Sequence, residues 1–254
     1  MANHIVVEKQ DRILAIRMDR PEKKNALTLA MYSAMAEALE KAGADAEVRV
    51  VLITGTKDCF TAGNDIADFA AAKPEQISPA IRFLEVLAAT AKPVVAAVTG
   101  VAIGIGTTML LHCDLVYAAS SARFQLPFVN LGLCPEAGST LILPSRLGHQ
   151  RAAELLFFGE PFGAEAARDL GLVNQVFTDQ ELPAAALARA KQLAEKPPNS
   201  LRTTKTLLKS ASAEAIKEAM ARERVQFAAL LQGAEAKEAM AAFMERRKPD
   251  FSRF

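Results

Sequence analysis

The sequence predicts a layered α/β domain, and three observations support this prediction. In the first half of the chain, short β-branched runs alternate with patterns typical of helices. After Asn174 the strand signals fade and long helical patterns follow. The 254 residues are 51% hydrophobic, which is enough apolar material to bury a sizeable core. These features exclude a disordered chain and a small disulfide-stabilised scaffold.

The predicted strands are short apolar runs, most of them rich in β-branched residues. They cover residues 5–8, 13–18, 50–54, 94–98 and 115–117. Between the second and third runs, residues 28–42 form a predicted helix in which Met31, Met35 and Leu39 recur on one face. Thr28 is a candidate N-cap, because its hydroxyl can accept a hydrogen bond from an amide of the first turn. We expect this helix to pack on the sheet.

The last part of the chain is predicted to be helical and to divide at a pair of prolines. Leu182, Ala186 and Leu193 share one helical stripe, and residues 195–198 (EKPP) then end the helix. We therefore predict a core formed by residues 1–195 and a helical C-terminal region formed by residues 196–254. Two apolar helical faces in this region are expected to pack on the core or on a neighbouring subunit. They consist of Ile216, Met220, Phe227 and Leu231, and of Ala236, Met240, Phe243 and Met244.

Charge and cysteine content narrow the possible partners and surroundings. The 30 Lys and Arg against 29 Asp and Glu give a net charge of +1, too balanced for the basic field typical of nucleic-acid binding. The three cysteines lack the paired spacing of a zinc site or disulfide framework, which indicates a reducing compartment. Because the first residues also lack the pattern of a secretory signal, we expect a cytoplasmic protein. The longest apolar tract, residues 93–111, is interrupted by glycines and is interpreted as buried core, with no membrane span.

Two glycine-containing loops follow predicted core strands. Residues 100–108 (GVAIGIGTT) lack the Lys of a P-loop, and Met109 stands where a dinucleotide fingerprint needs its third glycine. We interpret this stretch as a bend between a strand and a buried helix, where free backbone N–H groups can bind an anion or a developing oxyanion. Residues 60–66 (FTAGNDI) form a second such junction, although a simple turn and helix cap explains it as well. Together the two loops can direct two backbone donors to one carbonyl oxygen.

Several ordered motifs give the chain a resemblance to the crotonase, or enoyl-CoA hydratase/isomerase, family. They are residues 20–27 (RPEKKNAL), 60–66, 92–106, 131–138 (LGLCPEAG), 164–176 and 243–249 (FMERRKP). The resemblance implies an α/β fold built as a ClpP-like spiral of ββα units with a helical C-terminal region. It also implies binding of acyl-CoA thioesters and assembly as homotrimers or dimers of trimers.

The resemblance places an oxyanion hole at the backbone N–H groups of Asn64 and Ile105. These donors would polarise the thioester carbonyl and stabilise the enolate formed when a proton leaves the adjacent α-carbon. The two glutamates of family hydratases match Thr108 and Phe128, neither of which is a carboxylate. Glu136 instead matches the base of the Δ3,Δ2-enoyl-CoA isomerases. Without the resemblance, Glu136 would be interpreted as an acid in the first turn of a helix, favoured by the helix dipole.

The resemblance also suggests how CoA is held. For the acyl chain, Phe83, Leu84 and Leu87 on the helix after Pro79 are candidates. Lys23 and Lys24, which match positions near the CoA phosphates, can be interpreted equally well as solvated surface charges. The matching CoA positions are Ala62, Asp65 and Ile66 along the adenine and pantetheine path, Lys23 or Lys24 near the phosphates, and Phe243 and Arg246 on the last helix, which in some members comes from a neighbouring subunit.

The expected function is isomerisation of a 3-enoyl-CoA to a 2-enoyl-CoA by one glutamate, in fatty-acid or related acyl-CoA degradation. Another crotonase reaction, such as hydration or dienoyl isomerisation, remains an alternative. So does a non-catalytic homologue that binds acyl-CoA or RNA, although the balanced charge disfavours RNA and Glu136 disfavours inactivity. CoA is part of the substrate, so we expect no separate cofactor and no metal site.

Four other polar residues receive weaker interpretations. Ser139 and His149 invite a hydrolase hypothesis, but the sequence around Ser139 lacks a nucleophile-elbow pattern. His112 is interpreted as a core or capping residue, and Asn25 as a hydrogen-bonding loop residue. Glu223 shares a helical stripe with Ile216 and is expected to pair with an arginine at a subunit contact.

Overall fold

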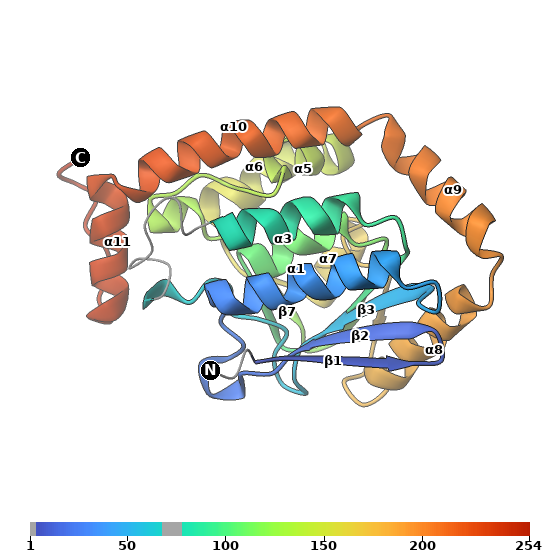
Figure 1. Cartoon of the computed structure of the whole chain (residues 1–254). Helices are drawn as coiled ribbons and strands as arrows, with labels where there is room; N and C mark the ends of the chain where they lie inside the picture. The colour runs from blue at the N-terminus through green and yellow to red at the C-terminus, as the bar shows by residue number, and fades with distance from the viewer. Residues whose placement is uncertain (1–3, 68–77) are drawn as a thin grey trace.

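The computed structural model describes residues 4–67 and 78–254, and within them the predicted α/β architecture is confirmed (Figure 1). Its main sheet has the order β1-β2-β3-β4-β6-β9, in which β1 is antiparallel to β2 and the other neighbouring pairs are parallel. The strands of this sheet are β1 (Ile5–Gln10), β2 (Ile13–Met18), β3 (Val50–Thr54), β4 (Val94–Val98), β6 (Leu115–Ala119) and β9 (Gln175–Phe177).

The main sheet is buried on both faces by helices. Val51, Ile53 and Val94 point into a large core that also contains apolar residues of α1 (Leu29–Ala44) and α3 (Ser78–Ala89). The alternate residues of the same strands, such as Val50 and Val95, pack against α8 (Leu182–Ala194). Because successive residues of a strand point to opposite faces and both faces are buried, apolar residues occupy consecutive positions. This explains why these strands appear in the sequence as continuous hydrophobic runs.

A second, small sheet lies at the ends of the main strands. It contains β5 (Val101–Ile103), β7 (Arg123–Gln125) and β8 (Phe162–Gly163), which the sequence reading missed. Two isolated parallel bridges, Leu27 to Asn64 and Thr61 to Ala102, extend the pairing to neighbouring loops. The glycine-rich bend is therefore corrected: strand β5 separates β4 from the short helix α4 (Ile105–Thr108).

The remaining helices cover the core and form the C-terminal part. They are α5 (Ser139–Leu147), α6 (His149–Phe158), α7 (Ala164–Asp169), α9 (Pro198–Ser210), α10 (Ala213–Leu231) and α11 (Ala234–Met244), with 3-10 turns at Pro21–Lys23, Met109–His112 and Val129–Leu131. Figure 1 shows α10 lying along α5 at the top of the molecule, with α9 and α11 at opposite sides.

Most of the predicted element positions agree with the structure. Helix α1 begins after Thr28, whose hydroxyl accepts a hydrogen bond from the Met31 amide, as predicted. Strands β1 and β6 each extend two residues beyond their predicted ends. Helix α8 ends at Ala194 and α9 begins at Pro198, so the helical path breaks at the predicted prolines. The division into residues 1–195 and 196–254 stays a prediction.

Candidate active site

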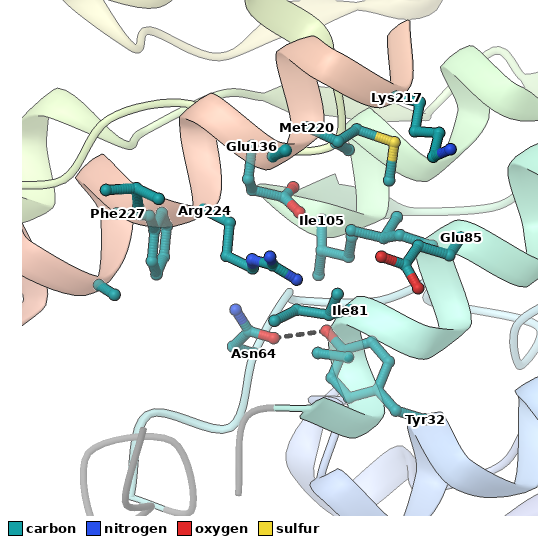
Figure 2. A pocket seen from close by; sticks show the side chains of 16 residues that line it. Tyr32, Asn64, Ile81, Glu85, Ile105, Glu136, Lys217, Met220, Arg224 and Phe227 are labelled. Carbon is teal, nitrogen blue, oxygen red and sulfur yellow. Dashed lines mark hydrogen bonds between the residues drawn. The ribbon is translucent and has the colours of Figure 1, made fainter. Parts of the chain in front are cut away.

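A cavity of about 510 Å³ opens between α1, α3, α4 and α10 (Figure 2). This volume is within the range typical of small-molecule sites. The three residues predicted to be catalytic, Asn64, Ile105 and Glu136, all line it, so the structure brings them together from three distant segments. The other lining residues are Tyr32, Ala80, Ile81, Leu84, Glu85, Ala137, Lys217, Met220, Ala221, Arg224, Val225, Phe227 and Ala228.

Asn64 and Ile105 are neighbours because the loop at 61–64 pairs with β5. The Thr61 amide donates to the carbonyl of Val101 at 2.9 Å, and the Ile103 amide donates to the carbonyl of Thr61 at 3.1 Å. Within the described part of the chain, the backbone N–H groups of Asn64 and Ile105 donate no hydrogen bond, and that of Ile105 is a free amide at the start of α4. Two main-chain donors are thus available at one cavity.

Gly63 is required for this approach of the two loops. Its φ angle of +92° lies in the region that favours glycine, and a Cβ there would stand 2.8 Å from the carbonyl oxygen of Ile103. A side chain at position 63 would therefore push the 61–64 loop away from β5 and separate Asn64 from Ile105.

Tyr32 of α1 holds the side chain of Asn64 at the edge of the cavity. Its hydroxyl donates a hydrogen bond to Asn64 Oδ1, the contact drawn as a dashed line in Figure 2. Burial, with the nearby charge of Glu136, raises the pKa of Tyr32 well above its ordinary value, so the phenol remains a donor. The sequence reading missed Tyr32, although its place beside the apolar stripe of α1 shows that it faces inward.

Glu136 lies in a tight loop that leads into α5. The next residue, Ala137, has a φ angle of +61°, which is uncommon for a residue other than glycine. His112 Nε2 donates to the Ala137 carbonyl at 2.8 Å, and the amide and hydroxyl of Ser139 donate to the Glu136 carbonyl at 3.1 and 2.6 Å. These hydrogen bonds hold the strained turn that directs the carboxyl of Glu136 into the cavity.

Glu223 of α10 fastens the same loop from the other side. Its carboxylate accepts hydrogen bonds from the Gly138 amide at 2.6 Å, from the Thr140 amide at 2.9 Å and from the Thr140 hydroxyl at 2.6 Å. Among the described residues of this chain Glu223 forms no salt bridge with an arginine, and its pairing at a subunit contact stays a prediction. The Glu223 carboxylate accepts hydrogen bonds from amides around the first turn of α5 that have no acceptor within the helix. The spacing of residues in the sequence does not show this contact.

The surroundings of Glu136 make its carboxyl a strong base for its type. Desolvation is the largest effect, and together with the nearby charge of Glu223 it raises the pKa of Glu136 to about 8. A hydrogen bond from the Thr108 hydroxyl to Glu136 Oε1 acts in the opposite direction, since it favours the ionised form. A general base with a pKa near the working pH is well suited to proton transfer.

Thr108 and Phe128, the positions that match the hydratase glutamates, have other roles here. Thr108 is completely buried at the end of α4 and donates to Glu136, as described above. Phe128 is part of the main hydrophobic core. Glu85 of α3 is a second carboxylate that lines the cavity, and the sequence reading missed it.

The predicted CoA-binding residues near the N-terminus lie outside the lining of this cavity. Lys23 and Lys24 are exposed at the 3-10 turn Pro21–Lys23. The amide of Ala62 donates to the carbonyl of Lys24 at 2.9 Å, which brings the two segments side by side. Asp65 forms an ion pair with Arg20 at 2.7 Å, and both side chains are largely buried. Ile66 is half-buried beside it.

Phe243 and Arg246 do not join the cavity of the same chain. Phe243 is 59% exposed near the end of α11, and Arg246 follows that helix. Figure 1 shows α11 at the edge of the molecule. Their contact with CoA, from this chain or from a neighbouring subunit as the family resemblance suggests for some members, stays a prediction.

The expectation for the acyl chain needs a correction. Leu84 lines the cavity as expected, together with Ala80 and Ile81 one turn earlier on α3. Phe83 and Leu87, however, are fully buried in the main core, because they lie on the side of α3 that is next to its cavity-facing residues and turns toward the core.

His112 and Asn25 are structural, as interpreted from the sequence. The buried His112 is hydrogen bonded to Ala137, and desolvation lowers its pKa to about 4. The buried Asn25 side chain donates to the carbonyls of Cys59 and Phe60 and accepts from the Arg20 amide. In residues 4–67 and 78–254 no group of three or more His, Cys, Asp or Glu side chains is placed to bind a metal ion. None of the described helices combines the length and the apolar character that a membrane crossing needs.

An α/β fold with two free main-chain donors and a desolvated glutamate at one cavity defines a class of enzymes that act on a carbonyl compound. The family model for enoyl-CoA hydratase/isomerase matches residues 8–253. The chain belongs to this family, and its fold is the crotonase fold expected from the sequence motifs.

Individual relatives include both hydratases and isomerases. The chain is 34% identical to 2,3-dehydroadipyl-CoA hydratase of Escherichia coli over 98% of each chain. It is 37% identical to enoyl-CoA delta isomerase 2 of Rattus norvegicus over 81% of this chain, which spans about half of that longer protein. The solved enoyl-CoA hydratase/isomerase of Pseudoalteromonas atlantica superimposes with a TM-score of 0.92 at 44% identity, covering 98% of this chain and all of the other.

Proposed function

We propose that the protein is a Δ3,Δ2-enoyl-CoA isomerase that uses Glu136 as its single base. The observation that carries this proposal is the carboxyl of Glu136 at the cavity, with its pKa raised to about 8, where the residues matching the hydratase glutamates are Thr108 and Phe128. A shift of a double bond along one face of a substrate needs only one base. A positioned general base contributes roughly 100- to 10,000-fold to such a rate.

The proton and electron movements balance within the substrate and Glu136. The carboxylate removes a proton from C2 of the 3-enoyl thioester, and the electrons of that bond delocalise into a dienolate. The carboxyl then returns the proton to C4, the double bond forms between C2 and C3, and Glu136 is a carboxylate again. The thioester remains intact, and no separate cofactor or metal is needed.

The free amides of Asn64 and Ile105 are proposed to form the oxyanion hole for this dienolate. Both residues line the cavity that holds Glu136, and we propose that one thioester oxygen accepts from both amides while the α-carbon lies near the carboxylate. A donor of this kind is typically worth about 3 to 4 kcal/mol in the transition state.

We further propose that the CoA part binds beside Lys23, Lys24, Ala62, Asp65 and Ile66, and that Phe243 and Arg246 reach it from a neighbouring subunit. The exposed apolar side chains of Phe243 and Met244 on α11 support a homotrimer or hexamer. Acyl-CoA degradation in the cytoplasm is the setting that fits this reaction. The delta isomerases among the relatives support the choice of isomerisation.

Hydration of a 2-enoyl-CoA is a second candidate, favoured by one observation. Glu85 brings a second carboxylate to the cavity, and hydratases are among the relatives. In this alternative Glu136 and Glu85 would position the water and protonate the product.

The test measures two reactions of the purified protein and its E136Q and E85Q variants. With a 3-enoyl-CoA, the isomerase proposal expects E136Q to lose at least about 100-fold in kcat, and E85Q to retain most of its activity. Activity of E136Q within a few-fold of the unmodified protein would refute the proposal. With a 2-enoyl-CoA in water, rapid hydration that is lost in both variants would establish the second candidate. Binding of acyl-CoA without exchange of the α-proton for deuterium would indicate a non-catalytic homologue.

A further inference from the structure

Arg224 of α10 is a cation that extends into the cavity (Figure 2). The figure shows its guanidinium reaching from α10 toward the region between Glu136 and Asn64. Within residues 4–67 and 78–254 it forms no hydrogen bond and no ion pair. Arg222, two residues earlier on the same helix, is not part of the cavity lining and pairs with Glu218 at 3.6 Å.

The other charged groups at the cavity leave Arg224 uncompensated. Lys217 and Glu85 lie on the same side of the cavity in Figure 2 and carry opposite charges. The pKa of Glu136 is set by desolvation, Thr108 and Glu223, so the guanidinium does not act as the counterion of the base. Lys217 and Glu85 offset one another, and Arg224 has no ion-pair partner among the described residues, so its guanidinium is available to an anionic group of a ligand.

A neutral acyl chain would be a poor occupant of a cavity with this charge. Arg224 is exposed where it enters the cavity, and a hydrocarbon chain beside it would offer its guanidinium no hydrogen bond in place of the water that it contacts. A carboxylate would instead accept two parallel hydrogen bonds from the planar guanidinium, a geometry that lysine cannot offer.

We propose that the site takes acyl-CoA substrates whose acyl chain ends in a carboxylate, and that Arg224 binds this carboxylate. The inference rests on the proposed function for the reacting end of the substrate and adds the chemistry of the far end. The apolar residues Ile81, Leu84 and Met220 would contact the methylene groups between the two ends.

The experiment compares pairs of 3-enoyl-CoA compounds that have equal chain length and differ only in a terminal carboxylate. Each pair is assayed with the unmodified protein and with R224M, R224K and the matched control R222M. We expect kcat/KM of the unmodified protein to favour the carboxylated member. R224M should lose about 10- to 100-fold more on the carboxylated substrate than on its partner, since hydrogen bonds to charged groups have this strength. R224K should recover part of the preference, and R222M should retain all of it.

Three outcomes would overturn the inference. If R224M loses the same factor in kcat/KM on both members of a pair, Arg224 binds the CoA phosphates. If kcat/KM of R224M is unchanged, Arg224 does not contact the substrate. A preference of the unmodified protein for the uncharged member would also contradict it. If neither compound is isomerised, the proposed function fails, but dissociation constants for saturated acyl-CoAs with and without the carboxylate still test Arg224 in the same variants.

Discussion

The carboxylate of Glu223 accepts a hydrogen bond from the backbone amide of Gly138 at 2.6 Å, two residues beyond Glu136. One acid of α10 therefore fixes the loop that carries the proposed base. The same carboxylate also raises the pKa of Glu136 through its charge. Glu223 thus acts on Glu136 both by position and by electrostatics, although it does not line the cavity.

Replacing Glu223 by Gln is expected to lower kcat about 10- to 100-fold with a smaller effect on KM. A glutamine has a single acceptor oxygen and cannot serve the amides of both Gly138 and Thr140 while also accepting from the hydroxyl. Because a negative charge near Glu136 is removed, the rising limb of kcat/KM against pH should also move to lower pH. The control is E218Q, an exposed acid of the same helix. A loss of activity with an unmoved pH profile would reduce Glu223 to a purely structural role.

Replacing Thr108 by Val is expected to move the pH profile in the opposite direction. In the unmodified protein kcat/KM should rise with pH to a plateau above about 8, because Glu136 must be ionised to accept the proton. The Thr108 hydroxyl lowers the pKa of Glu136 by its hydrogen bond, so its loss raises that pKa further. At pH 7 the variant should be about three- to tenfold slower, and it should approach the unmodified rate at high pH. An unchanged profile would contradict the role of the hydroxyl.

Glu136 should also make the stability of the protein fall with rising pH. Its pKa is raised from 4.5 to about 8 in the folded protein, so the folded state binds more protons than the unfolded state between these values. The free energy of unfolding therefore decreases as pH rises through this window, and the carboxyl contributes no further change above it.

The variant E136Q lacks this ionisation, so denaturant unfolding at pH 5.5 and 8.5 tests the effect. The stability of E136Q relative to the unmodified protein should increase by about 2 to 4 kcal/mol between the two conditions. E37Q, which removes an exposed acid of α1, should show no such change. Parallel curves for E136Q and the unmodified protein would show that the carboxyl is not desolvated.

The sequence predicted five of the six strands of the main sheet, and β3 and β4 are the clearest because their residues alternate between two buried faces. Val50 and Val51 pack on opposite sides of the sheet, which gives runs that are easily recognised. The sequence reading missed β9 (Gln175–Phe177), which lies just after Asn174, where the strand signals were expected to fade. Strands β7 and β8 were missed because they have three and two residues and are stabilised by pairing with distant segments. Pairing with segments that are distant in the sequence leaves no recognisable pattern of residues within the short strands themselves.

The motifs predicted which residues would meet at the cavity, but not the residues that complete it. Asn64, Ile105 and Glu136 were found because each lies in a motif of the family. Tyr32 and Arg224 lie on helices whose positions depend on tertiary packing, and an ordinary amphipathic pattern accounts for both. Their places at the cavity follow from the packing of α1 and α10 around it, which the local sequence does not determine.

The hydrogen bond from Tyr32 to Asn64 gives a last prediction, which separates the side chain of Asn64 from its backbone donor. Y32F should lower kcat/KM about three- to tenfold, since it loses one hydrogen bond that holds the loop of the proposed oxyanion hole. N64A keeps the backbone amide and should cost a similar amount, because it removes the same contact from the other partner. The double variant should then be little worse than either single variant, as expected for two residues that act through one interaction. Fully additive losses would show that Tyr32 and Asn64 act independently, and a much larger loss in N64A would indicate that its side chain contacts the substrate directly.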